Sequence, residues 1–401
     1  MEIPAIEGGR PVREKKDFLV FGQPDIREEE INEIIDTLKS RWIGTGPKTL
    51  KFERLFSHYI DPLGQTYAVA LSSCTAALHL SIKALDIGPG DEVITTPFSF
   101  IATANAIIHS GAKPVFVDIN KETFNINPDL IEEKINKNTK AILPIHFAGR
   151  PCEMDKILDI ANKYDLKIIE DAAHAIEAKY KNKKIGTIGD VTCFSFYATK
   201  NLTTAEGGMI TTKNKALADK IKNLSLHGLS ADAWARYSDI GYKHYLAINH
   251  GFKYNMTDLH SSLGIHQLAR LNDNFKKREK IWKIYNNAFR DLPIMLPKEE
   301  NSENLHARHL YKLILILDEL KITRDQFLDA LYQENIGSGV HYIPIHLHPS
   351  YQKYGYKRGD FPNSEFIGDR TVSIPLSPAL TEKDVQDVID AVTKILNYYK
   401  K

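Results

Sequence analysis

The sequence has few cysteines and no long apolar run. Its 401 residues include only Cys74, Cys152 and Cys193, and this odd, dispersed set argues against a disulfide framework and favours a reducing, cytoplasmic compartment. No apolar stretch approaches the roughly 20 residues that cross a bilayer, and residues 1–10 lack the apolar core of a signal peptide. We therefore expect a cytoplasmic protein with no membrane partner.

The sequence also lacks an excess of one charge and several common catalytic and nucleotide-binding motifs. The chain carries 52 basic and 51 acidic residues, a net charge of +1, so it shows no electrostatic footprint for nucleic acid. It has no Walker loop, zinc-protease helix or serine-elbow motif, and no Gly-x-Gly-x-x-Gly follows the first predicted strand. The length is sufficient for two domains and a large core.

The first half of the chain alternates between strand patterns and helical spacing. This alternation is typical of an α/β domain with a mainly parallel sheet, and ligands of such sheets bind at the carboxyl ends of the strands. The predicted strands cover residues 68–71, 93–96, 115–118, 141–145 and 167–170, and the predicted helices cover 26–38, 76–85 and 102–111.

The pattern changes after residue 200. Long helices and isolated strands replace the regular alternation, which predicts a smaller α+β domain at the C-terminus. We expect a polar N-terminal arm over residues 1–20, a large domain over 21–270 and a small domain over 271–401. Within the last part the sequence predicts helices at 267–289, 324–334 and 381–399, a strand at 310–317 and an extended segment at 341–349.

Lys200 and Asp171 give the strongest functional signal. Lys200 follows a strand-like run that begins at Val191, and Asp171 and His174 follow the apolar strand 167–170. A pyridoxal phosphate enzyme needs a lysine to form the Schiff base and an acid to pair with the pyridinium nitrogen. His174 would then contact the ring or its phenolic oxygen. Taken singly, Asp171 is equally well a helix cap and His174 a core histidine.

Other residues after the predicted strands suit the remainder of such a cofactor. Residues 72–76 lie between a strand and a helix, where free backbone N–H groups bind phosphate; an ordinary N-cap is the alternative. Phe100 is placed to stack on a planar ring or to pack in the core. Ser195 and Asn255 are possible phosphate donors, or a strand-end hydroxyl and a turn residue.

Three late histidines suggest a metal site at first sight. His341, His346 and His348 lie close in sequence, but Pro344 and Pro349 constrain the segment, and no acidic or cysteine partner is near. We therefore expect no metal, and a zinc enzyme remains only a minor alternative.

The order of these motifs resembles the DegT/StrS-type sugar-nucleotide aminotransferases, which are pyridoxal phosphate (PLP) enzymes of fold type I, the aspartate-aminotransferase fold. The resemblance extends from about residue 25 to residue 396. The segments that carry it are Trp42–Pro47, Ser72–His79, Gly90–Pro97, Glu170–Ala175, Phe194–Asn201 with Glu206–Gly208, and Tyr254–Asp258.

The resemblance implies roles for these residues. Lys200 would form the Schiff base and shuttle the proton, Asp171 would pair with the pyridinium nitrogen, and His174 would lie near the cofactor oxygen. Cys74 stands where Gly or Ala is common, but the phosphate needs only its backbone N–H. By the same resemblance Phe100 stacks on the ring, Ser73, Cys74, Thr75 and Ser195 bind the phosphate, Asn255 reaches the phosphate from the neighbouring subunit of a homodimer, and Trp42, Thr45, Gly46, His341 and Tyr342 line the substrate pocket.

The implied reaction is a ping-pong transfer of an amino group from L-glutamate to a keto-sugar nucleotide. The segment 227–237 looks like that of enzymes acting at C4, such as those making UDP-4-amino-4-deoxy-L-arabinose and 4-amino-4,6-dideoxyhexoses. Two alternatives stay open: another fold type I enzyme, a lyase or dehydratase, and a regulatory protein that retains the fold. Dehydratase relatives replace the lysine with histidine, whereas Lys200 is intact here.

Overall fold

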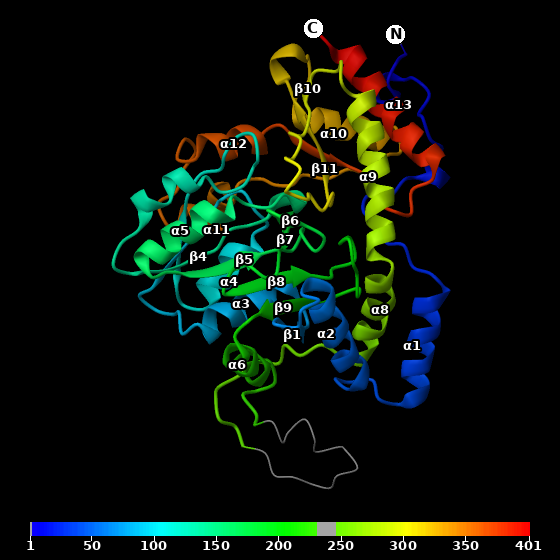
Figure 1. The fold of residues 1–401 in the computed structure, drawn as a ribbon. Helices are drawn as coiled ribbons and strands as arrows, with labels where there is room; N and C mark the ends of the chain where they lie inside the picture. Colours follow the sequence, from blue (N-terminus) through cyan, green and yellow to red (C-terminus); the bar gives the residue numbers. More distant parts are fainter. Residues whose placement is uncertain (1, 231–245) are drawn as a thin grey trace.

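A seven-stranded sheet forms the centre of the computed structural model, which describes residues 2–230 and 246–401 (Figure 1). The strand order is β1-β9-β8-β5-β4-β2-β3, and every pairing is parallel except those of β9 with its two neighbours. The strands are β1 (Tyr67–Leu71), β2 (Glu92–Thr95), β3 (Lys113–Phe116), β4 (Thr139–Ile142), β5 (Lys167–Asp171), β8 (Val191–Ser195) and β9 (Gly208–Thr212).

Helices cover both faces of this sheet. Successive strand residues point to opposite faces, so Ile168 belongs to one apolar core and Ile169 to the other. The first core includes Phe52 and Phe56, and the second includes Leu78. The first face is covered by α2 (Pro47–Ile60), α5 (Met154–Tyr164) and α8 (Asp258–Ala269), and the second by α3 (Cys74–Ala84), α4 (Ala102–His109) and α6 (Lys215–Ser225).

The C-terminal part forms a smaller module around a three-stranded antiparallel sheet of order β10-β11-β12. Its core contains Trp282, Tyr311 and Phe327. The expected fold class, a mainly parallel α/β architecture with a smaller α+β part, is confirmed; the division at residue 270 stays a prediction. The elements are α9 (Leu271–Ala288), β10 (Ile294–Met295), β11 (Tyr311–Leu315), α10 (Arg324–Gln333), α11 (Pro349–Gln352), α12 (Pro362–Gly368), β12 (Thr371–Ile374) and α13 (Glu382–Tyr399).

The N-terminal arm is bound to the C-terminal module, and the two chain ends lie close together in Figure 1. The backbone N–H groups of Ala5 and Val12 each donate to the carboxylate of Glu334 at 2.8 Å. Glu334 is fully buried and also pairs with Lys394 at 2.9 Å. Because a buried carboxylate is stable only when it is paired and hydrogen-bonded, this contact fixes the arm.

Three predicted elements differ from the observed ones. The predicted helix 267–289 is two helices, α8 and α9, with a break at Arg270, whose backbone is not helical (φ −106°, ψ 10°). Its guanidinium donates to the carbonyl of Asp25 and pairs with Glu30. The predicted strands 115–118 and 141–145 are observed two or three residues earlier, as β3 and β4. Two further helices, α1 (Glu28–Ser40) and α2, precede the sheet, and α2 is not among the predicted elements.

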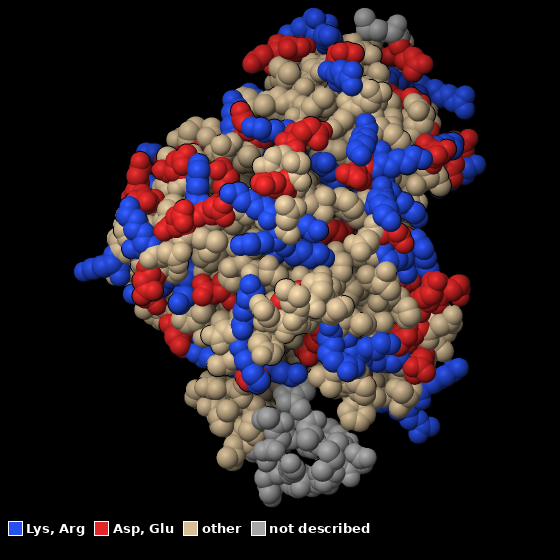
Figure 2. Space-filling model, viewed as in Figure 1, with Lys and Arg blue, Asp and Glu red and all other residues tan. Residues whose placement is uncertain are grey.

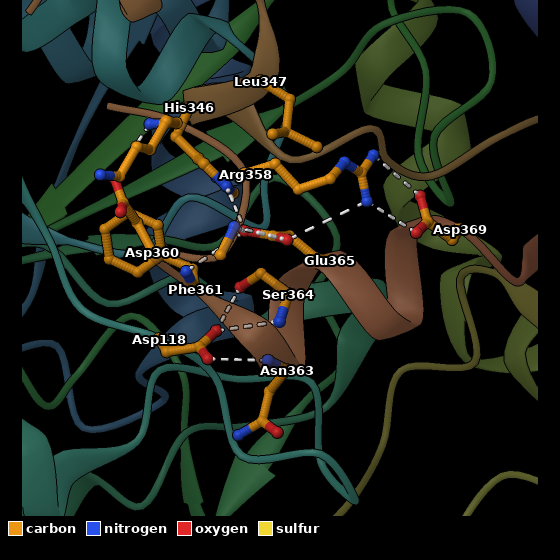
Figure 3. A network of polar contacts seen from close by, with 12 residues as sticks. Asp118, His346, Leu347, Arg358, Asp360, Phe361, Asn363, Ser364, Glu365 and Asp369 are labelled. Atoms are coloured by element: carbon orange, nitrogen blue, oxygen red, sulfur yellow. Dashed lines mark hydrogen bonds and ion pairs between the residues drawn. The ribbon is translucent and has the colours of Figure 1, made fainter. Parts of the chain in front are cut away.

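A polar network fastens α12 to the end of the large sheet (Figure 3). Asp118, just beyond β3, accepts hydrogen bonds from the backbone N–H groups of Asn363 and Ser364 at 2.8 and 2.9 Å. It therefore caps the first turn of α12. Nearby, Nε2 of buried His346 contacts Glu365 at 2.9 Å, so this histidine serves a structural contact.

The surface drawn in Figure 2 shows basic and acidic side chains interspersed over both modules. This agrees with the nearly balanced charge of the sequence. Within the described ranges, the helices are too short or too polar to cross a membrane.

Candidate active site

A cavity of about 530 Å³ lies at the carboxyl ends of β1, β5 and β8. This is the edge at which ligands of parallel sheets bind. Ten of the residues singled out in the sequence line it together: Ser73, Cys74, Thr75, Phe100, Asp171, His174, Ser195, Lys200, His341 and Tyr342.

Lys200 lies in the loop between β8 and β9 and is half-buried at this cavity. Its backbone N–H donates to the carbonyl of Tyr197 at 2.9 Å, which closes a tight turn. Burial lowers the pKa of the amine to about 8, although Cys74 and Asp171 act in the opposite direction. A substantial fraction of the amine is therefore neutral near pH 8, and the neutral form is the nucleophile that attacks a carbonyl group.

Asp171 ends β5 and faces the same cavity. Its Oδ2 accepts from the hydroxyl of Thr103 at 2.7 Å, and its Oδ1 accepts from the N–H of Ala173 at 3.1 Å. Burial raises the pKa of this carboxyl, while these two hydrogen bonds oppose the shift. The result is a fixed acceptor inside the cavity, suited to a protonated ring nitrogen.

His174 is held as a neutral imidazole. Its Nδ1 accepts from the backbone N–H of Ala148 at 3.1 Å, so the ring proton must sit on Nε2, 3.3 Å from the hydroxyl of Tyr342. Burial and the nearby charge of Lys200 keep its pKa well below the ordinary value. Its ring also packs against His309, with centroids 4.5 Å apart.

The start of α3 forms a cradle for an anion. Ser73 is the N-cap, and its hydroxyl accepts from the N–H of Ala76 at 3.0 Å. The next N–H groups, of Cys74 and Thr75, belong to the first turn, where backbone donors have no helical partner. Gly208 lies against this turn so closely that a Cβ there would come within 2.5 Å of the Ser73 backbone. These donors, with the hydroxyl of Ser195 beside the same cavity, fit a phosphate group.

Phe100 stands at the mouth of the cavity and is 58% exposed. Its ring centroid is 5.8 Å from that of Tyr342. An exposed aromatic ring at this place is available to stack on a planar group bound inside.

Four predicted site residues lie elsewhere in this chain. Trp42, Thr45 and Gly46 line a second cavity of about 740 Å³, beside α2 and α6. Asn255 lies next to this loop, and its Nδ2 donates to the hydroxyl of Thr45 at 2.6 Å. It pairs by its backbone with Leu71 at the end of β1 but does not line the main cavity. Within a single chain, these four residues therefore do not line the cavity that contains Lys200.

Two residues near Lys200, Thr103 and His309, carry little signal in the sequence. Thr103 lies in the first turn of α4, and its position after a strand is the only available hint. His309 lines a smaller cavity that Lys200 also borders, and no motif in the sequence points to it. The lining of the main cavity also includes Thr199, Glu206 and Gly207, which lie in segments that carry the family resemblance but were given no role.

The late histidines are distributed among different contacts. Nδ1 of His341 lies 2.9 Å from the hydroxyl of Ser373, and His346 contacts Glu365. Within residues 2–230 and 246–401, no three His, Cys, Asp or Glu side chains are arranged to hold a metal ion.

Fold and site together define a pyridoxal phosphate enzyme of fold type I, as the comparisons bear out. Residues 24–393 match the DegT/DnrJ/EryC1/StrS aminotransferase family, and the chain belongs to this family. It is 57% identical over 384 residues to the MJ1066 protein of Methanocaldococcus jannaschii (96% of this chain, 99% of that protein). It is 50% identical to the spore coat polysaccharide biosynthesis protein SpsC of Bacillus subtilis, again covering 96% and 99%.

A solved structure agrees with the fold over almost its full length. Spr1654 of Streptococcus pneumoniae, described as a sugar aminotransferase, superposes with a TM-score of 0.88 at 35% identity, covering 95% of this chain and 99% of that chain. It has been solved in PLP and PMP forms. The protein is thus an aminotransferase that uses pyridoxal phosphate. When bound, this cofactor supplies an aldehyde that takes up an amino group and a ring that withdraws electrons from the adjoining carbon.

Proposed function

We propose that the protein transfers an amino group from L-glutamate to a keto-sugar nucleotide, at C4 of the sugar, in a ping-pong reaction. The observation that carries this proposal is the partly neutral amine of Lys200 in one cavity with buried Asp171 and the anion cradle of α3. The names of SpsC and Spr1654 support a sugar as the acceptor. The preference for C4 rests on the segment 227–237, of which residues 231–237 lie outside the described part of the chain.

The roles follow from what each side chain offers. Lys200 would hold the cofactor covalently and then, as a free amine, take a proton from the substrate carbon and return it elsewhere. Asp171 would keep the ring nitrogen protonated, since a buried carboxylate favours a cation beside it. His174, neutral with its proton on Nε2, would donate to an oxygen. Ser73, Cys74, Thr75 and Ser195 would bind the phosphate, with Phe100 on the ring.

We propose a homodimer that shares its active sites. The outer side of α1 exposes Ile31, Ile35 and Leu38, which are 42%, 42% and 54% accessible. A contiguous apolar stripe of this kind marks a surface that another molecule covers. Asn255 and the loop with Trp42 lie outside the chain's own cavity, so in this proposal they complete the site of a partner subunit.

The substrate pocket and the cell compartment belong to the same proposal. His341 and Tyr342 line the main cavity and would contact the sugar. A nucleotide-activated sugar is made where nucleotides are made, which supports a cytoplasmic enzyme. Its product would enter polysaccharide or glycan assembly, consistent with the name of SpsC.

Two alternatives remain testable. A lyase or dehydratase of the same fold would use Lys200 and the cofactor without a lasting exchange of nitrogen. A regulatory protein would not require the covalent lysine, the buried acid and the anion cradle together.

The deciding experiment combines trapping with a half-reaction. Borohydride reduction and peptide mapping should place a pyridoxyl group on Lys200. In a separate sample, L-glutamate should convert the cofactor to its amine form and release one equivalent of 2-oxoglutarate. Modification of another lysine contradicts the assignment of Lys200. Trapping at Lys200 without 2-oxoglutarate favours the lyase or dehydratase.

A further inference from the structure

A series of largely buried polar contacts leads from the C-terminal module to Asn201, the residue after Lys200. It begins at Arg278 on α9, which is 1% exposed and pairs with Glu177, which is 3% exposed. The second carboxylate oxygen of Glu177 accepts from Nδ2 of Asn201 at 2.8 Å. Asn201 follows Lys200 directly in the sequence, so these contacts reach the residue next to the reactive lysine.

The orientation of the Asn201 amide determines the tautomer of His309. Nδ2 of Asn201 also donates to the carbonyl of Ala307 at 2.9 Å, and a backbone carbonyl can only accept. The other amide atom, Oδ1, must then accept from Nδ1 of His309, which lies 2.9 Å away. Nδ1 of His309 therefore carries a hydrogen.

His309 is neutral, so its Nε2 bears a lone pair. Burial and the nearby charge of Lys200 hold its pKa well below the ordinary value. Within the described part of the chain, Nε2 has no hydrogen-bond partner. A small cavity of about 20 Å³ adjoins the ring and is lined also by Thr199, Lys200 and His341. One water molecule needs a cavity of about 10–15 Å³, so this cavity has room for one.

We propose that His309 is a positioning residue for Lys200: Arg278, Glu177 and Asn201 fix it as the Nδ1–H tautomer, and its Nε2 accepts a hydrogen bond, through one water, from the lysine ammonium. His309 and Asp171 line different cavities, both of which Lys200 borders, and in this proposal the acceptor at His309 stabilises the protonated amine. The inference rests on the proposed role of Lys200. The titratable groups that line the two cavities with this lysine are Cys74, Asp171, His174, Tyr197, Glu206, His309, His341 and Tyr342.

In this proposal His309 helps to set the pH range over which the amine of Lys200 reacts. The pH dependence of this reaction can be measured without catalytic turnover. The apo-protein is treated with pyridoxal phosphate at pH 6 to 10, trapped with borohydride after short times, and mapped. The rate should rise with the neutral fraction of Lys200, with a midpoint near the pKa of about 8. In His309→Leu the lost acceptor should lower this midpoint by about one unit, making labelling about fivefold faster at pH 7.

Two further variants separate positioning from packing. His309→Gln can donate to Asn201 and offer an oxygen to the water, so its midpoint should return toward that of the parent. Glu177→Gln, remote from the amine, should shift the midpoint in the same direction as His309→Leu, because it loosens Asn201. The matched control is His348→Leu, which removes a histidine that lines neither cavity. A folded His309→Leu protein with the midpoint of the parent overturns the inference.

A measurement on the parent covers the case in which His309→Leu fails to fold. Nitrogen-15 histidine spectra, assigned with His309→Gln, should show His309 as a neutral Nδ1–H ring from pH 6 to 8. An imidazolium or an Nε2–H ring at pH 7 overturns the inference. Labelling that misses Lys200 refutes the proposed function itself, whereas labelling at Lys200 with unchanged midpoints refutes only the role of His309.

Discussion

The hydroxyl of Thr103 donates to Oδ2 of Asp171 at 2.7 Å, and this bond joins α4 to the end of β5. It holds one oxygen of a buried carboxylate while the other accepts from the N–H of Ala173. The hydroxyl of Thr103 is also 3.0 Å from that of Ser99. The buried acid that faces the main cavity is therefore oriented by a side chain from another element.

Thr103→Val should lower turnover about tenfold while leaving the fold intact. The change keeps the shape of the side chain but removes a hydrogen bond to a charged group, worth about 1.5–3 kcal/mol. The pKa of Asp171 should rise further, because this bond is among the influences that lower it. Steady-state kinetics measure the first effect. Thr393→Val on α13 is the control, and a parent-like rate for Thr103→Val would show that the bond does not orient the acid.

Asp171→Asn should retain some cofactor but reduce turnover about 100-fold or more. An amide cannot hold a proton on the ring nitrogen, so the ring withdraws electrons less effectively. Absorbance reports cofactor content, and stopped-flow mixing with L-glutamate reports the rate. The exposed Asp129→Asn is the matched control. Equal rates for Asp171→Asn and the parent would make Asp171 a structural residue.

Lys200→Ala should fold normally and lose transamination by at least about 1,000-fold, since it removes the proposed covalent anchor and proton carrier. Circular dichroism checks the fold, and release of 2-oxoglutarate checks the reaction. Lys156→Ala, on the surface of α5, should behave as the parent. Near-normal activity of Lys200→Ala would contradict the assignment of Lys200.

The sequence predicted where Lys200 and Asp171 would lie because Asp171 stands at the end of one strand and Lys200 in the loop after another. β5 and β8 are neighbours and parallel, so their carboxyl ends fall at one edge of the sheet. Thr103 and His309 could not be predicted in the same way. Thr103 reaches the main cavity, and His309 the smaller cavity beside Lys200, through packing between elements that are distant in sequence. Local apolar spacing carries no information about such contacts.

Helix α2 was missed although its sequence does carry signals of a helix. Its start at Pro47 is a known signal, because proline is favoured in the first turn of a helix. Its buried residues Phe52, Phe56 and Ile60 do follow helical spacing. The break at Arg270, in contrast, depends on tertiary contacts with Asp25 and Glu30, and no local pattern shows these.

Asn255→Ala should weaken cofactor retention about tenfold if this side chain reaches the phosphate of a partner subunit, because one hydrogen bond to a charged group is lost. The dissociation constant can be measured by fluorescence titration of the apo-protein. The exposed Asn397→Ala is the control. Sedimentation of both variants checks that any loss does not come from dissociation of the dimer. Unchanged affinity would remove Asn255 from the shared site.

Gly208→Ala should lower both thermal stability and cofactor affinity. A Cβ at this position would come within 2.5 Å of the Ser73 backbone and 2.6 Å of the N–H nitrogen of Cys74. The start of α3 must then move, at a cost of about 1–3 kcal/mol, and the proposed phosphate donors move with it. Gly88→Ala is the control, since its added Cβ meets only an ordinary contact at 3.6 Å. Calorimetry with and without pyridoxal phosphate measures both effects.

The single reversed strand of the large sheet limits how the loop of Lys200 can change in length. Because β9 runs antiparallel to β8, residues 196–207 leave and re-enter the sheet at the same edge, and the pair Ser195–Gly208 closes them. The register of this pair cannot slip, since alternate residues of both strands fill the two opposite cores. An insertion or deletion here cannot be absorbed by sliding a strand or extending a crossover helix. It would move the amine itself, so this loop should tolerate sequence changes far better than length changes.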